Sequence, residues 1–287
     1  MPGLSSFTTR PLIPSAFTFF KTLGRQGAFI QAAEVALRHF EVAAPADPAA
    51  FEKFFNAQAS KYRLAIGADA FHDARKSAAK WYLVEIYQVW DTFTKALRDE
   101  YRIYKRLAKW KAHDNGATLT AFQQLLLNLP RPNARQIETK PEFHVLEYYL
   151  SVRNWIIHPT TETARQTERD LKLLLKNHST YLQKKYAAVH APNPTSALSF
   201  DDHMLFSRAL VMLTPVINDA CDLQNEEIER LMIPARKRQL RDRQMPKARI
   251  RRIGSAFFTL YHGVNAARRN EFADYVLQRF TEGHYSK

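Results

Sequence analysis

Several residue types that define common classes of site are scarce in this sequence. Its 287 residues include one cysteine and eight glycines. One cysteine excludes a disulfide within the chain and is typical of the reducing cytoplasm, where we expect the protein to act. The histidines are scattered, and without cysteine pairs they predict no metal site and no cofactor. Gly24 and Gly27 are not followed by Lys-Ser or Lys-Thr, so a loop that cradles nucleotide phosphates is not indicated.

Long apolar runs and alternating strand patterns are also missing. No apolar stretch approaches the ~20 residues that a membrane span requires, so we expect no membrane association. Apolar residues recur instead at steps of three and four, most clearly between Asp69 and Lys111, which is the spacing of one helix face. The sequence therefore predicts an all-α protein. Further helices are expected over residues 17–42, 49–66, 118–129, 138–158, 161–189 and 254–280, with a turn at 130–133 and a linker at 191–196.

Acidic residues are too few to balance the basic ones. The formal net charge is +14 and the pI is about 9.8, which favours a polyanionic partner. Net charge by itself leaves RNA, DNA and an anionic membrane open as that partner. No acid precedes Glu34, a composition that an organellar presequence shares with an ordinary basic helix.

The basic residues concentrate in one segment near the C-terminus. Residues 236–252 hold nine basic residues and the single acid Asp242. We interpret this segment as an arm that contacts the RNA backbone, because clustered cations displace counterions from phosphates. A solvated connector before the last helix is the alternative. The arm comprises Arg236, Lys237, Arg238, Arg241, Arg243, Lys247, Arg249, Arg251 and Arg252.

A polar stripe and a lone arginine mark the predicted helix over residues 138–158. Val145, Tyr149, Val152 and Ile156 define its core face. Glu147, Asn154 and His158 fall within roughly 60° of one another on a different face. Arg153 interrupts an apolar row of Leu146, Leu150 and Ile157, where a guanidinium needs an anionic or polar partner. Pro159 should end the helix at His158.

The segment from Arg153 to His158 resembles the R-N-x-x-x-H motif of HEPN-superfamily ribonucleases. An arginine followed by a histidine after four to six intervening residues occurs three times in the chain, but only Arg153 is followed by a polar residue and lies late in a long amphipathic helix. The resemblance covers residues 69–190 and implies a HEPN-like helical bundle. It divides the chain into an N-terminal helical extension (1–68), the bundle (69–190) and a C-terminal helical region that carries the basic arm (191–287).

The resemblance implies a metal-independent endoribonuclease that cleaves RNA by attack of the 2′-hydroxyl. His158 would act as acid or base, Arg153 would bind the phosphate, and Asn154 would position either group. Glu147 is a further candidate for orienting His158 or Arg153. Family members commonly build the site from two chains, so we expect a homodimer with Leu146, Leu150 and Ile157 at the contact.

The resemblance also implies a biological setting, and two other interpretations stay open. The setting is a toxin or an antiviral, abortive-infection effector held in check by a regulatory protein or RNA. One alternative is a non-catalytic RNA-binding and dimerisation protein that uses the basic arm. The other is structural, with Arg153 reaching solvent, Asn154 a surface amide and His158 a favourable charge at the helix C-terminus.

Overall fold

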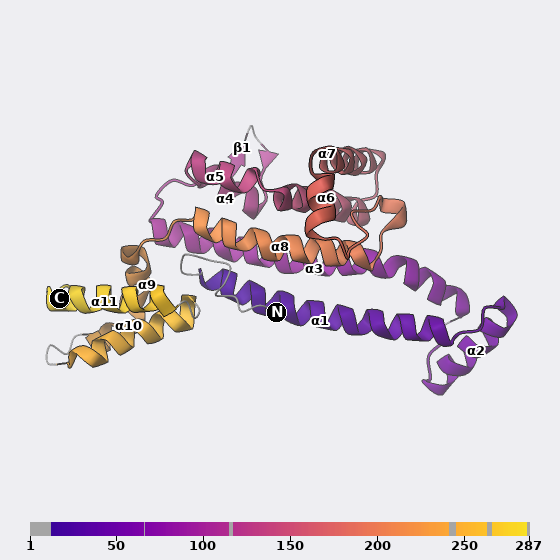
Figure 1. Ribbon diagram of the computed structural model, residues 1–287, viewed down its shortest axis with the longest axis horizontal. Coiled ribbons are helices and arrows are strands. Elements are labelled where there is room, and N and C mark those ends of the chain that lie inside the picture. The colour runs from indigo at the N-terminus through magenta and orange to yellow at the C-terminus, as the bar shows by residue number, and fades with distance from the viewer. Residues whose placement is uncertain (1–12, 66, 115–116, 241–244, 263–265, 286–287) are drawn as a thin grey trace. The chain divides into compact units, whose positions relative to one another are not determined.

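The computed structural model describes residues 13–65, 67–114, 117–240, 245–262 and 266–285, and these are mostly α-helical (Figure 1). The predicted all-α class is confirmed. None of the described helices is long and apolar enough to cross a lipid bilayer. The elements are α1 (Pro14–Ala43), α2 (Pro48–Lys61), α3 (Ala68–Lys105), β1 (His113–Asp114), β2 (Ala117–Thr118), α4 (Ala121–Asn128), α5 (Arg131–Glu138), α6 (Pro141–Ile157), α7 (Thr161–Lys185), α8 (Phe200–Ala220), α9 (Asn225–Leu240), α10 (Lys247–His262) and α11 (Ala266–Thr281).

Side chains at the helix N-termini explain where several helices begin. The Asp47 carboxylate accepts a hydrogen bond from the Ala50 amide at 2.8 Å and caps α2. Thr120 and Gln123 form a capping box at the start of α4, and Thr160 and Thr163 form one at the start of α7. Each cap gives a partner to amides that the helix itself leaves without one.

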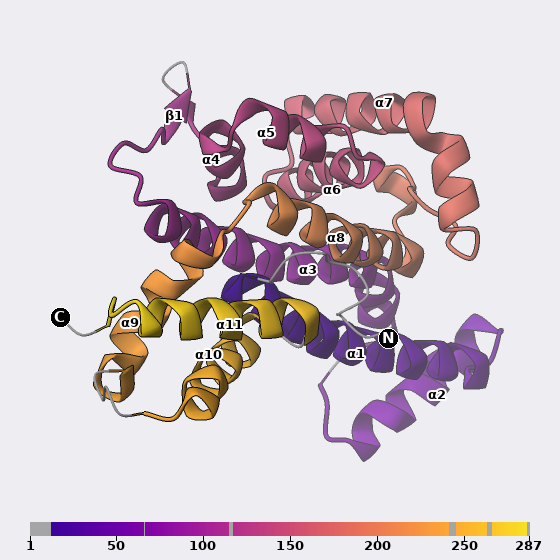
Figure 2. The same cartoon turned by 60° about the vertical axis from the view of Figure 1, so that its left-hand side comes forward.

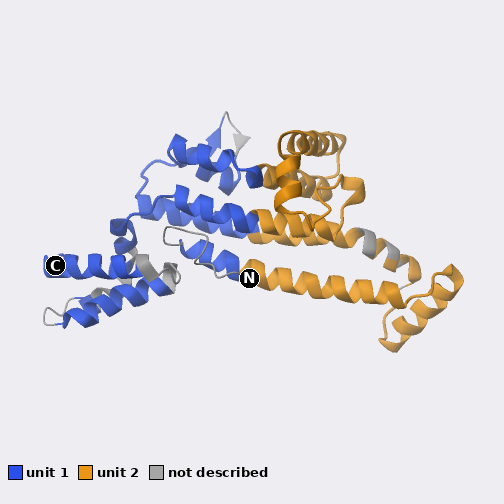
Figure 3. Cartoon of the chain, viewed as in Figure 1, with its two compact units in different colours: residues 1–21, 90–143, 210–287 blue, residues 22–89, 144–209 orange. Residues whose placement is uncertain are grey.

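The chain forms two compact units (Figure 3). Unit 1 contains residues 1–21, 90–143 and 210–287, and unit 2 contains residues 22–89 and 144–209. Each unit is therefore assembled from segments that are far apart in the sequence. The division at residues 69 and 190, which follows from the family resemblance, stays a prediction.

The core of unit 2 is built around α6. Val145, Tyr149 and Val152 have no exposed surface, as the periodicity predicts. The Tyr149 ring lies 5.0 Å from the ring of Phe206 on α8, measured between centroids. On the other side, the hydroxyl of Thr167 on α7 donates to the carbonyl oxygen of Ser151 at 3.5 Å. These contacts fix the helix that carries the motif.

Aromatic rings form much of the core of unit 1. Phe19 stacks on Phe93 at 4.6 Å, and Trp90 meets Phe122 edge-on at 5.2 Å. The C-terminal helices α10 and α11 lie side by side (Figure 2). Gly254 permits this close approach, because a Cβ there would lie 3.2 Å from the Cα of Ala273.

The structure corrects several predicted helix boundaries. Helix α3 ends at Lys105 rather than Lys111, because Arg106 adopts a positive φ of 49°, which an α-helix does not accommodate. The expected turn at 130–133 instead opens into α5. Pro132 lies in the first turn of that helix, where its missing N–H removes no helical hydrogen bond. Likewise, α6 begins at Pro141 rather than at residue 138.

The C-terminal region contains more helix than the sequence indicated. The single helix expected over 254–280 is two helices, α10 and α11. Residues 225–240 form α9, and α10 already begins at Lys247. Among the described residues of the basic segment, 236–240 and 247–252 therefore lie in helices. The choice between an arm that contacts RNA and a solvated connector stays a prediction.

Candidate functional site

The motif occupies the last turn of α6 and the loop that follows. Helix α6 ends at Ile157, and the backbone amide of His158 donates to the carbonyl oxygen of Asn154 at 2.8 Å. The hydroxyl of Thr163 on α7 donates to the carbonyl oxygen of His158 at 3.0 Å. The backbone of His158 is thus held between two helices while its side chain is exposed.

Arg153 is half-buried and meets an aromatic ring rather than an acid. Its guanidinium carbon lies 4.8 Å from the centroid of the Tyr87 ring on α3. One terminal nitrogen donates to the side-chain oxygen of Asn154 at 3.1 Å, whereas the buried Nε has no hydrogen-bond partner. The cation–π contact partly offsets the desolvation of the charge. A polar partner was expected from the sequence, and Asn154 and Tyr87 fill that role.

The structure brings two of the three predicted catalytic side chains together. Arg153 and Asn154 are hydrogen-bonded, but within the described chain no hydrogen bond or ion pair reaches the imidazole of His158. Five residues along one helix amount to about 7.5 Å of rise and leave the two side chains about 140° apart. A site that uses both Arg153 and His158 therefore needs either a long reach by Arg153 or a second chain.

Glu147 does not orient His158 within one chain. Their separation of eleven positions corresponds to about 16 Å of helix, which corrects that part of the prediction. Glu147 instead accepts from, or pairs with, His144 Nδ1 at 3.0 Å. The His144 ring stacks on His178 of α7, with centroids 4.8 Å apart. Sequence reasoning missed this cluster, because His178 comes from another helix.

Helix α3 supplies two further side chains beside the motif. Lys80 and Tyr87 are seven residues apart and so lie on one face of α3. The Lys80 ammonium lies 5.0 Å above the Trp155 ring, and the Tyr87 ring lies under the Arg153 guanidinium. Two cation–π pairs therefore join α3 to this part of α6. No spacing in the sequence linked α3 to the motif.

Part of the expected dimer contact is buried within the chain itself. Leu146 is buried, with 2% of its surface exposed, and Leu150 is half-buried. Ile157 remains 43% exposed. Leu146 therefore cannot contribute to a contact with a second chain, and that residue is withdrawn from the predicted interface. The homodimer itself stays a prediction.

The basic segment is spread over two helices. Arg236, Lys237 and Arg238 lie in α9, and Lys247, Arg249, Arg251 and Arg252 are exposed on α10. Arg241 and Arg243 lie outside the described residues. Only Arg251, among the four on α10, has an acidic partner in the described part of the chain, namely Asp274 of α11. Three exposed cations thus remain available to a polyanion.

Metal and thiol chemistry gain no support from the side-chain arrangement. Across the described ranges, no group of three or more His, Cys, Asp or Glu side chains is placed to hold a metal ion. Cys221 is buried, and burial raises the pKa of its thiol to about 12. A thiol that stays protonated is a poor nucleophile, as expected from its place in an apolar stretch.

No family model matches the chain, and no curated protein or solved structure matches it either.

A buried histidine makes the stability of unit 2 depend on pH. His203 of α8 is 1% exposed, and its ring packs against Phe200 and Tyr82. Burial lowers the pKa of His203 from 6.5 to about 4, against the opposing charge of Glu34. Since the unfolded chain takes up the proton first, this group's stabilisation is complete above pH 6.5 and is lost as the pH falls towards 4.

We therefore expect the free energy of unfolding to fall by about 3 kcal/mol through His203 over that pH interval. Denaturant unfolding of the wild type and of His203→Phe, measured every half pH unit, isolates this contribution from the titration of carboxylates. The variant should show the flatter profile. The control is His39→Gln, which changes an exposed histidine of α1 and should keep the wild-type profile. The assignment is contradicted if this control is as flat as His203→Phe, or if the profiles of the wild type and His203→Phe are parallel.

Proposed function

We propose that the protein is a metal-independent endoribonuclease of the HEPN type whose site includes Arg153, Asn154 and His158. The observation that carries the proposal is the state of Arg153. Its guanidinium is half-buried, has no acidic partner in the described residues, and makes a single hydrogen bond there, from one terminal nitrogen to Asn154. An arginine prepared in this way can bind a phosphate through two parallel hydrogen bonds.

The chemistry follows from the residue types. His158 is exposed and can accept the proton of the 2′-hydroxyl or donate one to the departing 5′ oxygen. The 2′ oxygen attacks phosphorus, the bond to the 5′ oxygen breaks, and the products carry a 2′,3′-cyclic phosphate and a 5′-hydroxyl. Arg153 stabilises the charge on the phosphorane, and Asn154 holds the guanidinium in place.

A second chain completes the site in this proposal. No hydrogen bond joins Arg153 to His158 within the described chain, and a two-fold arrangement would place the arginine of one protomer near the histidine of the other. The exposed Ile157 beside His158 and the half-buried Leu150 are the remaining apolar candidates for that contact. The proposed setting is cytoplasmic, as a toxin or antiviral effector that a regulatory protein or RNA restrains.

Incubation of the pure protein with end-labelled total RNA tests the activity. We expect internal cleavage that persists in excess EDTA and leaves 2′,3′-cyclic phosphate ends, because the proposed step uses an imidazole and a guanidinium and no metal ion. Product ends are read by their resistance to ligation until a phosphatase that opens the cyclic phosphate is added. Cleavage that stops in EDTA, or that leaves 3′-hydroxyl ends, would contradict this mechanism.

A non-catalytic RNA-binding protein is the second candidate. It is favoured by the exposed Lys247, Arg249 and Arg252 of α10, which have no acidic partner in the described residues. Such a protein would bind RNA with a steep salt dependence. It would leave the RNA intact under every condition of the assay above, and this outcome separates the two candidates.

A further inference from the structure

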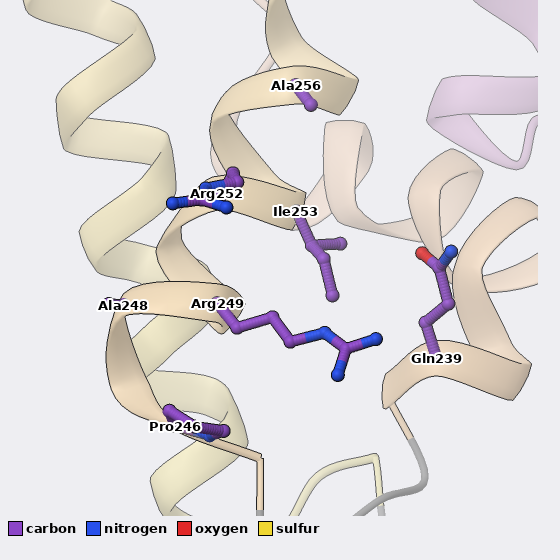
Figure 4. Close-up of a pocket in the computed structure, with 7 residues that line it drawn as sticks. All are labelled: Gln239, Pro246, Ala248, Arg249, Arg252, Ile253 and Ala256. Carbon is purple, nitrogen blue, oxygen red and sulfur yellow. The ribbon is translucent and has the colours of Figure 1, made fainter.

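A pocket of about 440 Å³ lies between the end of α9 and the start of α10. Its wall on α10 consists of Arg249, Arg252, Ile253 and Ala256, and Gln239 faces them from α9. In Figure 4, Arg249 and Ile253 extend from α10 into the space in front of Gln239. The volume falls within the range of about 300–1,000 Å³ that is usual for small-ligand sites.

The two arginines of α10 that line this pocket differ from Arg251 in having no acidic partner within the described chain. Arg249, Arg252, Ile253 and Ala256 follow the spacing of one helix face. Arg249 and Arg252 have no acidic partner within the described chain, whereas Arg251, which does not line this pocket, is paired with Asp274. The first turn of α10 also contains no acid, so the positive end of the helix dipole adds to the charge of the two arginines.

Charge accounts for only part of the lining. Ile253 and Ala256 give the pocket an apolar wall, and the exposed amide of Gln239 offers a donor and an acceptor opposite it. A guanidinium binds a phosphate through its edge and stacks on a planar base through its face. The two guanidinium groups, the apolar wall and the amide together match the phosphate and base of a nucleotide better than they match a bare anion.

We propose that this pocket binds one nucleotide unit, with the phosphate on the two arginines and the base between the apolar wall and Gln239. The inference rests on the proposed function in taking RNA as the polyanion that supplies this unit. It deepens the role of the basic segment, because it replaces diffuse attraction by a defined subsite for one phosphate and one base. A free mononucleotide has the same chemistry and is the other source.

Calorimetry with the full chain tests the pocket without any cleavage step. AMP should bind at least ~10-fold more tightly than inorganic phosphate, because the base adds contacts to the apolar wall and to the Gln239 amide that phosphate lacks. Arg249→Ala with Arg252→Ala should weaken AMP binding by ~10-fold or more. The control Arg251→Ala, which removes one positive charge from the same helix, should change AMP binding by less than ~3-fold.

A lysine variant distinguishes a built site from a general positive field. Arg249→Lys with Arg252→Lys keeps both charges but loses the planar fork, so AMP binding should stay weak. Any of three results would overturn the proposed nucleotide site. These are wild-type AMP affinity in the lysine variant, equal losses in Arg251→Ala and the alanine pair, and equal binding of AMP and phosphate.

Fluorescence anisotropy with a labelled single-stranded RNA identifies the source of the nucleotide. We expect the alanine pair to weaken RNA binding and to lower the salt slope by about one to two phosphates. If the alanine pair weakens AMP binding but leaves RNA binding unchanged, the pocket is assigned to a free mononucleotide and the RNA subsite is overturned. Absence of RNA cleavage, in contrast, would overturn the proposed nuclease and leave these binding measurements unaffected.

Discussion

Replacing Asp202 with alanine should lower the free energy of unfolding by about 3–5 kcal/mol. The Asp202 carboxylate of α8 is fully buried and accepts five hydrogen bonds. One comes from the Tyr149 hydroxyl of α6 at 2.8 Å, and the others come from Asn193 and Ser199. Alanine would leave the fully buried Tyr149 hydroxyl without this acceptor and would remove the acceptor shared by Asn193 and Ser199. Loss of a buried acceptor costs far more than the loss of an exposed contact.

The neighbouring Asp201 provides the control for this experiment. Its carboxylate accepts one hydrogen bond, from the His190 amide at 2.9 Å, and is half-exposed. Asp201→Ala should therefore cost about 1 kcal/mol or less. Chemical denaturation of both variants measures the difference. Similar losses in the two variants would show that the buried network contributes little beyond a helix cap.

The same network connects stability to the candidate site. Asp202 and Tyr149 join α8 to the helix that carries Arg153, and the hydroxyl of Tyr148, the preceding residue, donates to the carbonyl oxygen of Asn193. Burial, and then the charge of Asp202, raises the pKa of Tyr149 well above its ordinary value, so its hydroxyl stays a donor. The position of α6 thus depends on a loop that lies about forty residues further along the chain.

Helical periodicity was sufficient to predict the fold class, and local signals explain where it failed. The predicted core face of α6 is confirmed for Val145, Tyr149 and Val152, because burial repeats along a single helix, whereas Ile156 is only half-buried. Helix α5 was missed because Pro130 and Pro132 indicate a turn, although proline is also favoured in the first turn of a helix. Helix α9 was missed because its basic second half has no apolar stripe of its own.

The contacts of the site could not be read from the sequence for a different reason. Tyr87 meets Arg153 from a helix 66 residues earlier, and His178 meets His144 from 34 residues later. Such pairs depend on how helices pack, which spacing within one helix does not encode. The sequence indicated that Arg153 needs a polar partner, and only the packing identified which residues are available to it.

His158→Ala should reduce RNA cleavage by ~100-fold or more, since a positioned acid or base contributes about 10²–10⁴ to a proton-transfer step. RNA affinity should stay unchanged, because the exposed cations of α10 are left intact. Single-turnover cleavage and anisotropy, measured on the same preparation, separate the two effects. The exposed His190 is the control, and His190→Ala should retain activity. Wild-type rates in His158→Ala would remove this histidine from the site.

Mixing two inactive variants tests whether two chains share the site. If Arg153 of one protomer acts with His158 of the other, a refolded mixture of Arg153→Ala and His158→Ala chains contains heterodimers with one intact site. Random pairing then restores roughly a quarter of the wild-type activity. A site built within one chain would show no recovery, because each chain then carries a defect in its own pair. The separation of Arg153 from His158 along α6 makes recovery the expected result.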